Sequence, residues 1–223
     1  MLIKSGIGFL TVILFSIIAV PPAHALWWMG YHKPAFKGKV IDAETKEPIE
    51  GAVVVVVYHK TSMGIAESYS VTINVKEALT DKNGEFYIPS YTTLIQPLSW
   101  ENMANFIIFK PGYGNFPVYQ RTPSGIKPKD EEIFFSRETG KEGELEMWID
   151  GEKQPELKTI KVTFGVVELP KLKTREEREK ALSIPNLPLE FTCYKIKNLV
   201  RLLGEEYVNL GYSDYKRWME DCK

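Results

Sequence analysis

Residues suited to metal or nucleophilic chemistry are scarce in this chain. Its 223 residues include 2 Cys and 3 His, and the formal net charge is only -1. A chain without a basic excess lacks the surface that nucleic acids or acidic lipids attract. Two Cys without neighbouring His also fall short of a zinc ligand set. The sequence therefore predicts no bound metal, no cofactor and no nucleic-acid partner.

Catalytic motifs are missing as well. No Gly-x-Ser-x-Gly nucleophile turn and no phosphate-binding glycine loop occurs. Lone histidines such as His32 and His59 are typical of surface positions, and the adjacent acids Glu131–Glu132 and Glu176–Glu177 are typical of solvated segments. We therefore predict that the protein is not an enzyme. The alternative is an envelope enzyme that acts on glycans through two carboxylates distant in sequence.

The N-terminal segment has the pattern of a secretory signal peptide. Lys4 precedes an apolar run from Ile7 to Val20, and Pro21 and Pro22 end it. Ala23-His24-Ala25 then provides a small-x-small cleavage site. We predict a signal peptide over 1–25 and an exported protein, periplasmic or extracellular. An uncleaved anchor is the alternative, although the run is shorter than the roughly 18–20 residues of a membrane span.

Export determines how the two cysteines are interpreted. Cys193 and Cys222 are both close to the C-terminus. An even count in an oxidising compartment predicts a disulfide between them. The loop-entropy model gives such a ring a stabilisation of roughly 3–4 kcal/mol. Two unpaired buried thiols are the alternative.

The middle of the chain predicts short strands separated by turns. Phe36–Asp42 alternates apolar and polar residues, and Ala52–Tyr58 contains five consecutive valines. Such a β-branched run indicates a strand buried on both faces, or a sandwich strand with a covered outer face. Asn83-Gly84 predicts the tight turn of a hairpin. Further strands are expected at 105–110, 116–119, 133–136, 146–149 and 159–167.

Four stretches in this order carry a family resemblance: Gly38–Asp42, Pro48–Val55, Thr80–Phe86 and Phe109–Tyr113. Together they resemble the carboxypeptidase regulatory-like domain, clearly over 36–115 and to about 170 if 162–172 supplies the last strand. The resemblance implies a mainly β protein, a seven-stranded, Ig-like sandwich of transthyretin-like topology. Intradiol dioxygenases share a similar sandwich but hold iron with a His-x-His pair, which this sequence lacks. The connections 60–77, 90–104 and 120–158 are longer than those of the family pattern. They are either binding loops or surface insertions.

The C-terminal part predicts helices. Thr174-Arg175-Glu176-Glu177 has the form of a capping box and predicts a helix to about Leu182. A second helix from about Thr192 aligns an apolar stripe that we expect to pack on its own domain, and Gly211 ends it. The stripe consists of Ile196, Leu199, Val200, Leu203, Tyr207 and Leu210. The predicted organisation is a signal peptide (1–25), a sandwich (26–170) and a helical extension (171–223).

These predictions favour an exported, non-catalytic module with a binding or structural role in the cell envelope. Aromatic side chains such as Trp27-Trp28, Tyr91 and Trp100 are candidate contacts to an unknown envelope protein or glycan. A structural subunit that assembles through exposed strand edges is a further alternative. The sequence does not identify the ligand or the oligomeric state.

Overall fold

The computed structural model describes residues 30–118, 127–128, 130–149, 156–184, 187–188, 191 and 194–212. The predicted signal peptide, Trp27-Trp28 and both cysteines lie outside the described residues, so cleavage and the Cys193–Cys222 disulfide remain predictions. The described chain is mainly β. Its elements are β1 (Gly30–Lys33), β2 (Phe36–Asp42), β3 (Val53–Met63), β4 (Ser68–Leu79), β5 (Glu85–Ile88), β6 (Tyr91–Leu94), β7 (Ser99–Glu101), β8 (Asn105–Phe109), β9 (Lys127–Pro128), α3 (Glu131–Ser136), β10 (Glu142–Ile149), β11 (Glu156–Thr163), β12 (Val166–Leu169), α4 (Arg175–Ala181) and α5 (Lys197–Asn209).

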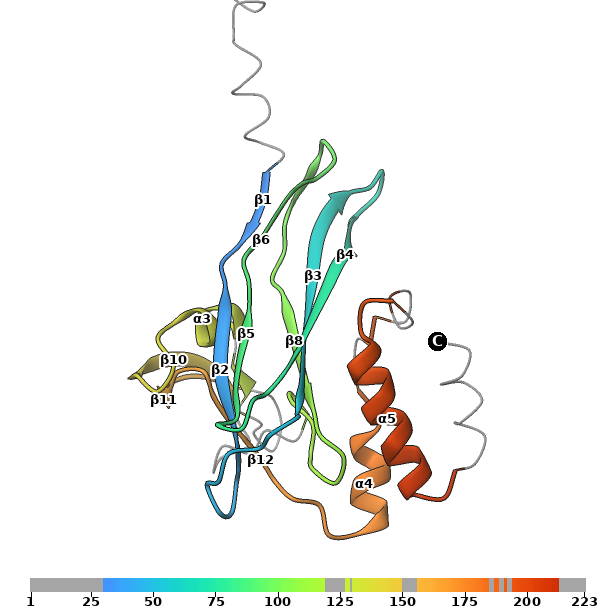
Figure 1. Cartoon of the computed structure of the whole chain (residues 1–223). Helices are drawn as coiled ribbons and strands as arrows, with labels where there is room; N and C mark the ends of the chain where they lie inside the picture. Colours follow the sequence, from blue (N-terminus) through green and yellow to red (C-terminus); the bar gives the residue numbers. More distant parts are fainter. Residues whose placement is uncertain are drawn as a thin grey trace, which may run out of the picture.

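Two sheets face one another and enclose the main core (Figure 1). In one sheet β3 pairs with β4 on one side and with β8 and β7 on the other, all antiparallel. In the other, β2 pairs antiparallel with β5 and parallel with β12. The β1–β6 pair continues the β2–β5 sheet toward one end of the molecule, and the β10–β11 hairpin, paired with β9, projects from the side.

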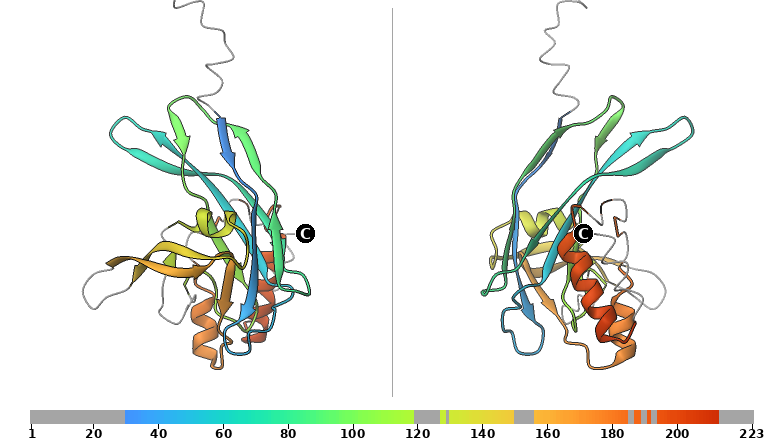
Figure 2. Two further views of the ribbon diagram at one scale, coloured as in Figure 1. Left: turned by 90° about the vertical axis from the view of Figure 1, so that its left-hand side faces the viewer. Right: turned by 45° about the vertical axis from the view of Figure 1, so that its right-hand side comes forward.

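The valine run of β3 is buried on both faces of its sheet. Val54 and Val56 belong to the core between the sheets, whereas Val53, Val55 and Val57 pack against α5. All five are at most 1% exposed. Full burial stabilises a valine by about 1.5–3 kcal/mol relative to exposure. The prediction of a strand with a covered outer face is confirmed, and Figure 2 shows that α5 supplies the cover.

The Asn83–Gly84 turn does not close a hairpin, and that prediction is wrong. β4 pairs with β3, but β5 pairs with β2 in the opposite sheet. The turn is still tight: Gly84 has a φ of 74°, and its N–H donates to the carbonyl of Asp81. Just before it, the Thr80 hydroxyl donates to the carbonyl of Ile49 and accepts from the N–H of Ala52. These bonds hold the end of β4 to its own sheet, so the chain turns from one sheet to the other.

The strand expected at 133–136 is also wrong, because this segment forms the short helix α3. The Asp130 side chain accepts from the N–H of Ile133 and caps the helix. Phe134 and Phe135 then pack into the main core. A run of only four residues has too few positions for periodicity to separate helix from strand.

The long connections contain much of the regular structure. Segment 60–77 is the far half of a β3–β4 hairpin whose turn occupies only 64–67. Segment 90–104 contains β6 and β7, and 120–158 contains β9, α3, β10 and the start of β11. The strand expected at 159–167 divides at Phe164 and Gly165 into β11 and β12, and at 116–118 only Phe116 forms an isolated bridge. Tyr119 lies outside the described residues.

The two helices near the C-terminus follow the sequence pattern closely. The Thr174–Glu177 capping box is present at the start of α4. The α5 helix begins at Lys197, five residues later than expected, and Gly211 at a φ of 86° follows its end. Four residues of its stripe, Ile196, Leu199, Val200 and Leu203, pack on the outer face of β3, within the same domain as expected. No helix among the described residues is long and apolar enough to cross a membrane.

Candidate functional site

The structure places the two candidate histidines among different partners. On β1, the exposed His32 has its Nδ1 at 2.8 Å from the hydroxyl of Thr92. On β3, the half-buried His59 has its Nδ1 at 3.4 Å from the hydroxyl of Thr72. Within the described residues, no group of three or more His, Cys, Asp or Glu side chains is arranged to hold a metal ion.

The Glu131–Glu132 pair does not lie on a solvated segment, and that prediction is wrong. Glu131 is 7% exposed and accepts a 2.8 Å hydrogen bond from the N–H of Phe106. Glu132 accepts from the N–H of Ala104. Because α3 packs against the start of β8, both carboxylates face backbone donors there. The other pair, Glu176–Glu177, is exposed, and Glu177 belongs to the α4 cap.

A buried ionic and aromatic cluster lies where β1 meets β7 and α3. Lys33 is 5% exposed, and its Nζ lies 2.8 Å from Glu132 and 3.6 Å from Glu101. The pKa of Tyr31 is raised, mainly by burial and to a smaller extent by the nearby Glu132. The pKa of Tyr58 is also raised, mainly by burial and to a smaller extent by Tyr91. Both phenols therefore remain neutral. Since the carboxylates are already bonded to Lys33 or to backbone N–H groups, this cluster ties strands together and offers no free acid.

The two phenol hydroxyls of this cluster are unusual. Within the described residues, the Tyr31 and Tyr58 hydroxyls are buried without a hydrogen-bond partner. Buried polar groups usually have a hydrogen-bond partner, which is either another protein group or an ordered water. Their rings surround Tyr91, which lies 4.8 Å from the Tyr58 ring centroid. Tyr91 is thus packed against the core, which argues against its expected role as a contact residue.

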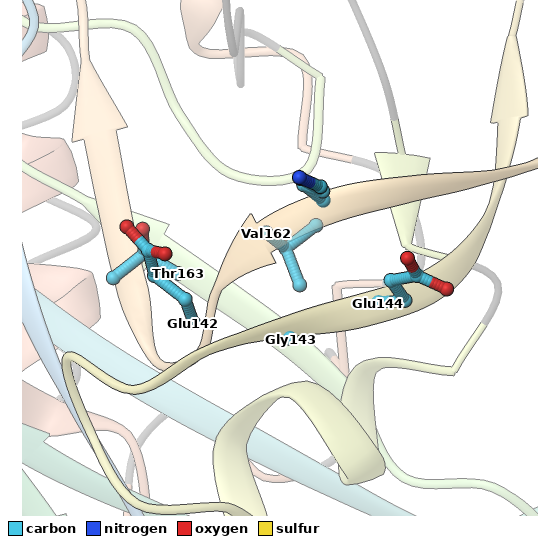
Figure 3. Close-up of a pocket in the computed structure, with 6 residues that line it drawn as sticks. Glu142, Gly143, Glu144, Val162 and Thr163 are labelled. Carbon is cyan, nitrogen blue, oxygen red and sulfur yellow. The ribbon is translucent and has the colours of Figure 1, made fainter.

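A depression of about 330 Å³ lies on the β10–β11 hairpin (Figure 3). Its outer face carries Glu142 opposite Thr163 and Glu144 opposite Lys161. All four residues are exposed. The general acid of a glycosidase lies in a site shielded from solvent, whereas these carboxylates are open to solvent beside a lysine. The depression therefore lacks the shielded acid pair that the glycan-enzyme alternative requires.

A second hollow, about 390 Å³, surrounds His59. Its polar lining contains no Asp, Glu, Lys or Arg, and Met103, Leu187 and Pro188 add apolar surface. The polar lining residues are His59, Ser70, Thr72, Asn102 and Asn105. Amide, hydroxyl and imidazole groups both donate and accept hydrogen bonds. Such a set matches the hydroxyls of a neutral sugar.

The most distinctive surface is formed by the β3–β4 turn and the β6–β7 connection. Large apolar side chains are exposed there, including Ile65 completely and Leu98 at 71%. We call this surface the apolar tip; its residues are Met63, Ile65, Tyr69, Leu94, Leu98 and Trp100. In both Figure 1 and Figure 2 the two turns lie at the same end of the molecule as the start of β1.

Backbone contacts join the parts of the apolar tip. The N–H of Met63 donates to the carbonyl of Leu98 at 3.0 Å, which links the β3–β4 turn to the β6–β7 connection. On the other side, Leu94 of β6 is the register partner of Gly30, the first residue of β1. The tip is therefore one connected end of the protein.

Charge is nearly absent from these segments. Thr61–Ile73 contains one charged residue, Glu67, and Tyr91–Trp100 contains none. At the chain average of 26%, these 23 positions would carry about six charges. The nearby Lys60 is 8% exposed and donates to the Gln96 side chain at 2.8 Å. The outward surface of the tip thus combines apolar exposure with a lack of charge.

Sequence reasoning found only part of this surface. Trp100 was expected to be available for contact, and it is 45% exposed. The lengths of the connections 60–77 and 90–104 are compatible with binding loops or with insertions, and they do not predict that the two connections meet at one end. The charge-free run Tyr91–Trp100 is the signal in the sequence that marks the region.

The fold and this surface define a class: a mainly β protein with two facing sheets, the helices α4 and α5 on one outer side and an apolar end with little charge. A particular family is not indicated by comparison. No protein-family model, curated protein or solved structure matches the chain.

Proposed function

We propose that the protein is an exported, non-catalytic binding module of the cell envelope, built on a seven-stranded sandwich of transthyretin-like, carboxypeptidase regulatory-like type. Two sheets with a common core support this fold type, as does the order of the sequence motifs. The rigid sheets act as a platform, and the apolar tip makes the contact. Export itself rests on the signal-peptide pattern of residues 1–25.

The apolar tip is the observation that carries this proposal. Isolated exposed apolar residues are ordinary, but several that gather at one end of a molecule favour an interaction site there. Here six large side chains are exposed on adjacent turns with one charged residue among them. Keeping them in water is unfavourable, and burying them against a partner removes that cost.

The environments of two acid pairs, Glu131–Glu132 and Glu142/Glu144, support a non-catalytic role. Glu131 and Glu132 are bonded to backbone N–H groups, and Glu132 also pairs with Lys33. Glu142 and Glu144 are exposed on the β10–β11 hairpin. Neither pair combines a shielded acid with an available base, which glycoside hydrolysis requires.

The hollow around His59 favours a second candidate function, glycan binding. A neutral sugar would bond to the Asn102 and Asn105 amides and the Thr72 hydroxyl. We expect the N102A/N105A double variant to lose binding to purified envelope glycans, measured by calorimetry. Wild-type protein that binds no glycan would overturn this second function and leave the role of the tip intact.

Photo-crosslinking in the natural host tests the primary proposal. A photoreactive residue replaces Ile65 or Leu98 in the tip, and replaces the exposed Tyr87 on β5 as the control. We expect adducts with an envelope component from positions 65 and 98 and none from position 87. Equal labelling from all three positions, or none from the tip, would contradict the proposal.

A further inference from the structure

We propose that the partner of the apolar tip is a lipid bilayer, which the side chains of the tip enter. This inference rests on the tip being the binding surface proposed above. It names the chemistry of the partner and predicts the orientation of the molecule, with the tip toward the membrane and α4 and α5 away from the tip.

The described part of the chain begins at the apolar tip. Gly30 starts β1 at the tip, opposite Leu94. The sequence just before it is Leu26-Trp27-Trp28-Met29, four apolar or aromatic residues without a charge. Farther back lies the apolar run Ile7–Val20. Whether cleavage after Ala25 removes that run or not, uncharged apolar chain joins the protein at its apolar end.

The residue types of the tip suit a membrane interface. Trp and Tyr are enriched where hydrocarbon meets headgroups, and leucine and isoleucine partition into the acyl region. The tip presents Trp100, Tyr69, Ile65 and Leu98, and the adjoining sequence adds Trp27 and Trp28. A typical protein interface instead has a polar rim and about ten hydrogen bonds. These 23 residues carry a single charge, so any such rim would have to come mainly from uncharged hydroxyl and amide groups.

The backbone of Leu98 provides an independent argument. Its φ is 60°, in the left-handed region that favours glycine, and its side chain is 71% exposed. The conformation costs energy and the exposed side chain regains none within the protein. Non-glycine residues in this region are associated with functional sites. Insertion into a bilayer gives the leucine side chain an apolar surrounding at a position where the backbone conformation is unfavourable.

Lipid composition separates this mode from electrostatic attraction. The tip lacks a cluster of lysines or arginines, so anionic headgroups gain no specific attraction from it. Binding by apolar insertion should therefore be similar for zwitterionic vesicles and for vesicles that contain an anionic lipid.

The test uses the protein purified from its host with an environment-sensitive fluorescent amino acid at position 65, 98 or 87. Vesicles of phosphatidylcholine, with or without phosphatidylglycerol, are then added. We expect a blue shift at positions 65 and 98, none at position 87, and no dependence on phosphatidylglycerol. This readout reports the tip itself, so it works whether or not the N-terminal segment is retained.

Paired substitutions provide the second measurement. I65S/L98S should weaken partitioning of the purified protein into phosphatidylcholine vesicles by about tenfold or more. The matched control L79S/Y87S removes two exposed apolar side chains remote from the tip and should have no effect. Circular dichroism and thermal unfolding establish that both double variants remain folded.

The outcomes separate this inference from the proposed function. No spectral shift at positions 65 and 98, or an equal loss in both double variants, overturns the lipid assignment. If the tip still forms adducts with an envelope protein in the host, the binding module stands and its partner is a protein. If neither lipid nor protein adducts form, both proposals fail.

Discussion

The buried carboxylate of Glu206 accepts two hydrogen bonds from the guanidinium of Arg178, at 2.6 and 2.7 Å. Glu206 lies on α5 and is 2% exposed, whereas Arg178 lies on α4. The two bonds connect positions 28 residues apart and join α4 to α5 beside the β3 sheet. Because Glu206 is buried, the stability of the folded protein depends on Arg178 as the partner of this carboxylate.

Removing Arg178 should therefore be costly. We expect R178A to lower the free energy of unfolding by about 3 kcal/mol, because it leaves a buried charge without its partner. The double variant R178M/E206L should recover most of that loss. Urea denaturation measures both, with R175A, at an exposed ion pair, as the control expected to cost at most about 1 kcal/mol. Equal effects of R178A and R175A would show that the pair is not required.

Glu77 of β4 caps the first turn of α5. Its carboxylate accepts from the N–H groups of Asn198 and Leu199 at 2.9 and 3.1 Å. We expect E77A to cost about 1–2 kcal/mol, in the range of lost N-caps, and E77Q to cost less because its amide oxygen still accepts. Hydrogen exchange should accelerate at both amides in E77A. E205A, at an exposed pair farther along α5, is the control and should leave these amides protected.

Asp42 should make the free energy of unfolding depend on pH in the acid range. Burial raises the pKa of Asp42, but hydrogen bonds from the N–H groups of Thr45 and Glu44 and from the Tyr113 hydroxyl outweigh it, so the net pKa lies below its ordinary 3.8. A carboxyl with a lowered folded-state pKa stabilises the fold above the ordinary value. That stabilisation disappears as the pH falls through the folded-state pKa.

The D42N variant tests this sign. The difference in free energy of unfolding between wild type and D42N should be largest near neutral pH and should shrink as the pH falls below about 4. Chemical denaturation at several pH values measures it. A difference that is constant with pH would mean that the Asp42 charge plays no part.

The backbone conformation of Leu98 should lower the stability of the fold, because a leucine is strained at this φ. We expect L98G to raise the free energy of unfolding by about 1 kcal/mol, because glycine adopts a φ of 60° without steric cost. The same variant should weaken binding to vesicles. Lys46, at a φ of 62° in another turn, offers the matched control, since K46G should leave vesicle binding unchanged. A destabilised L98G protein would contradict the strain argument.

The intact mass of the protein from its host tests export and the disulfide together. A chain that begins at Leu26 and gains two protons on reduction would agree with signal-peptide cleavage and a Cys193–Cys222 bond. A full-length mass with free thiols would exclude both and would mean a retained N-terminal segment.

Local features of the fold were predictable from the sequence. Three such features are the strand Phe36–Asp42, the valine run and the Thr174–Glu177 capping box. Each depends on interactions and conformational preferences of residues that are close together in the sequence. The stripe of α5 repeats with the helical period, so its buried face could be named before its partner was known. The covered outer face of β3 followed from the valines alone.

Pairing and burial between distant segments were decided by the tertiary structure. Asn83-Gly84 specifies a turn, but the bonds of Thr80 to Ile49 and Ala52 determine that the turn crosses between sheets. Periodicity contains no such information. Likewise, the sequence predicts that the adjacent acids Glu131 and Glu132 are solvated. In the structure α3 packs on β8, and each carboxylate accepts a hydrogen bond from a backbone N–H there.

The candidate site shows the same division. The sequence by itself determined that Tyr91–Trp100 carries no charge and that apolar residues precede Gly30. Only the tertiary structure brought Leu98 beside Met63 and Leu94 opposite Gly30, through backbone hydrogen bonds between segments some 35 to 64 residues apart. Local composition selects which residues are apolar; sheet register, a long-range property, decides that they share one end of the protein.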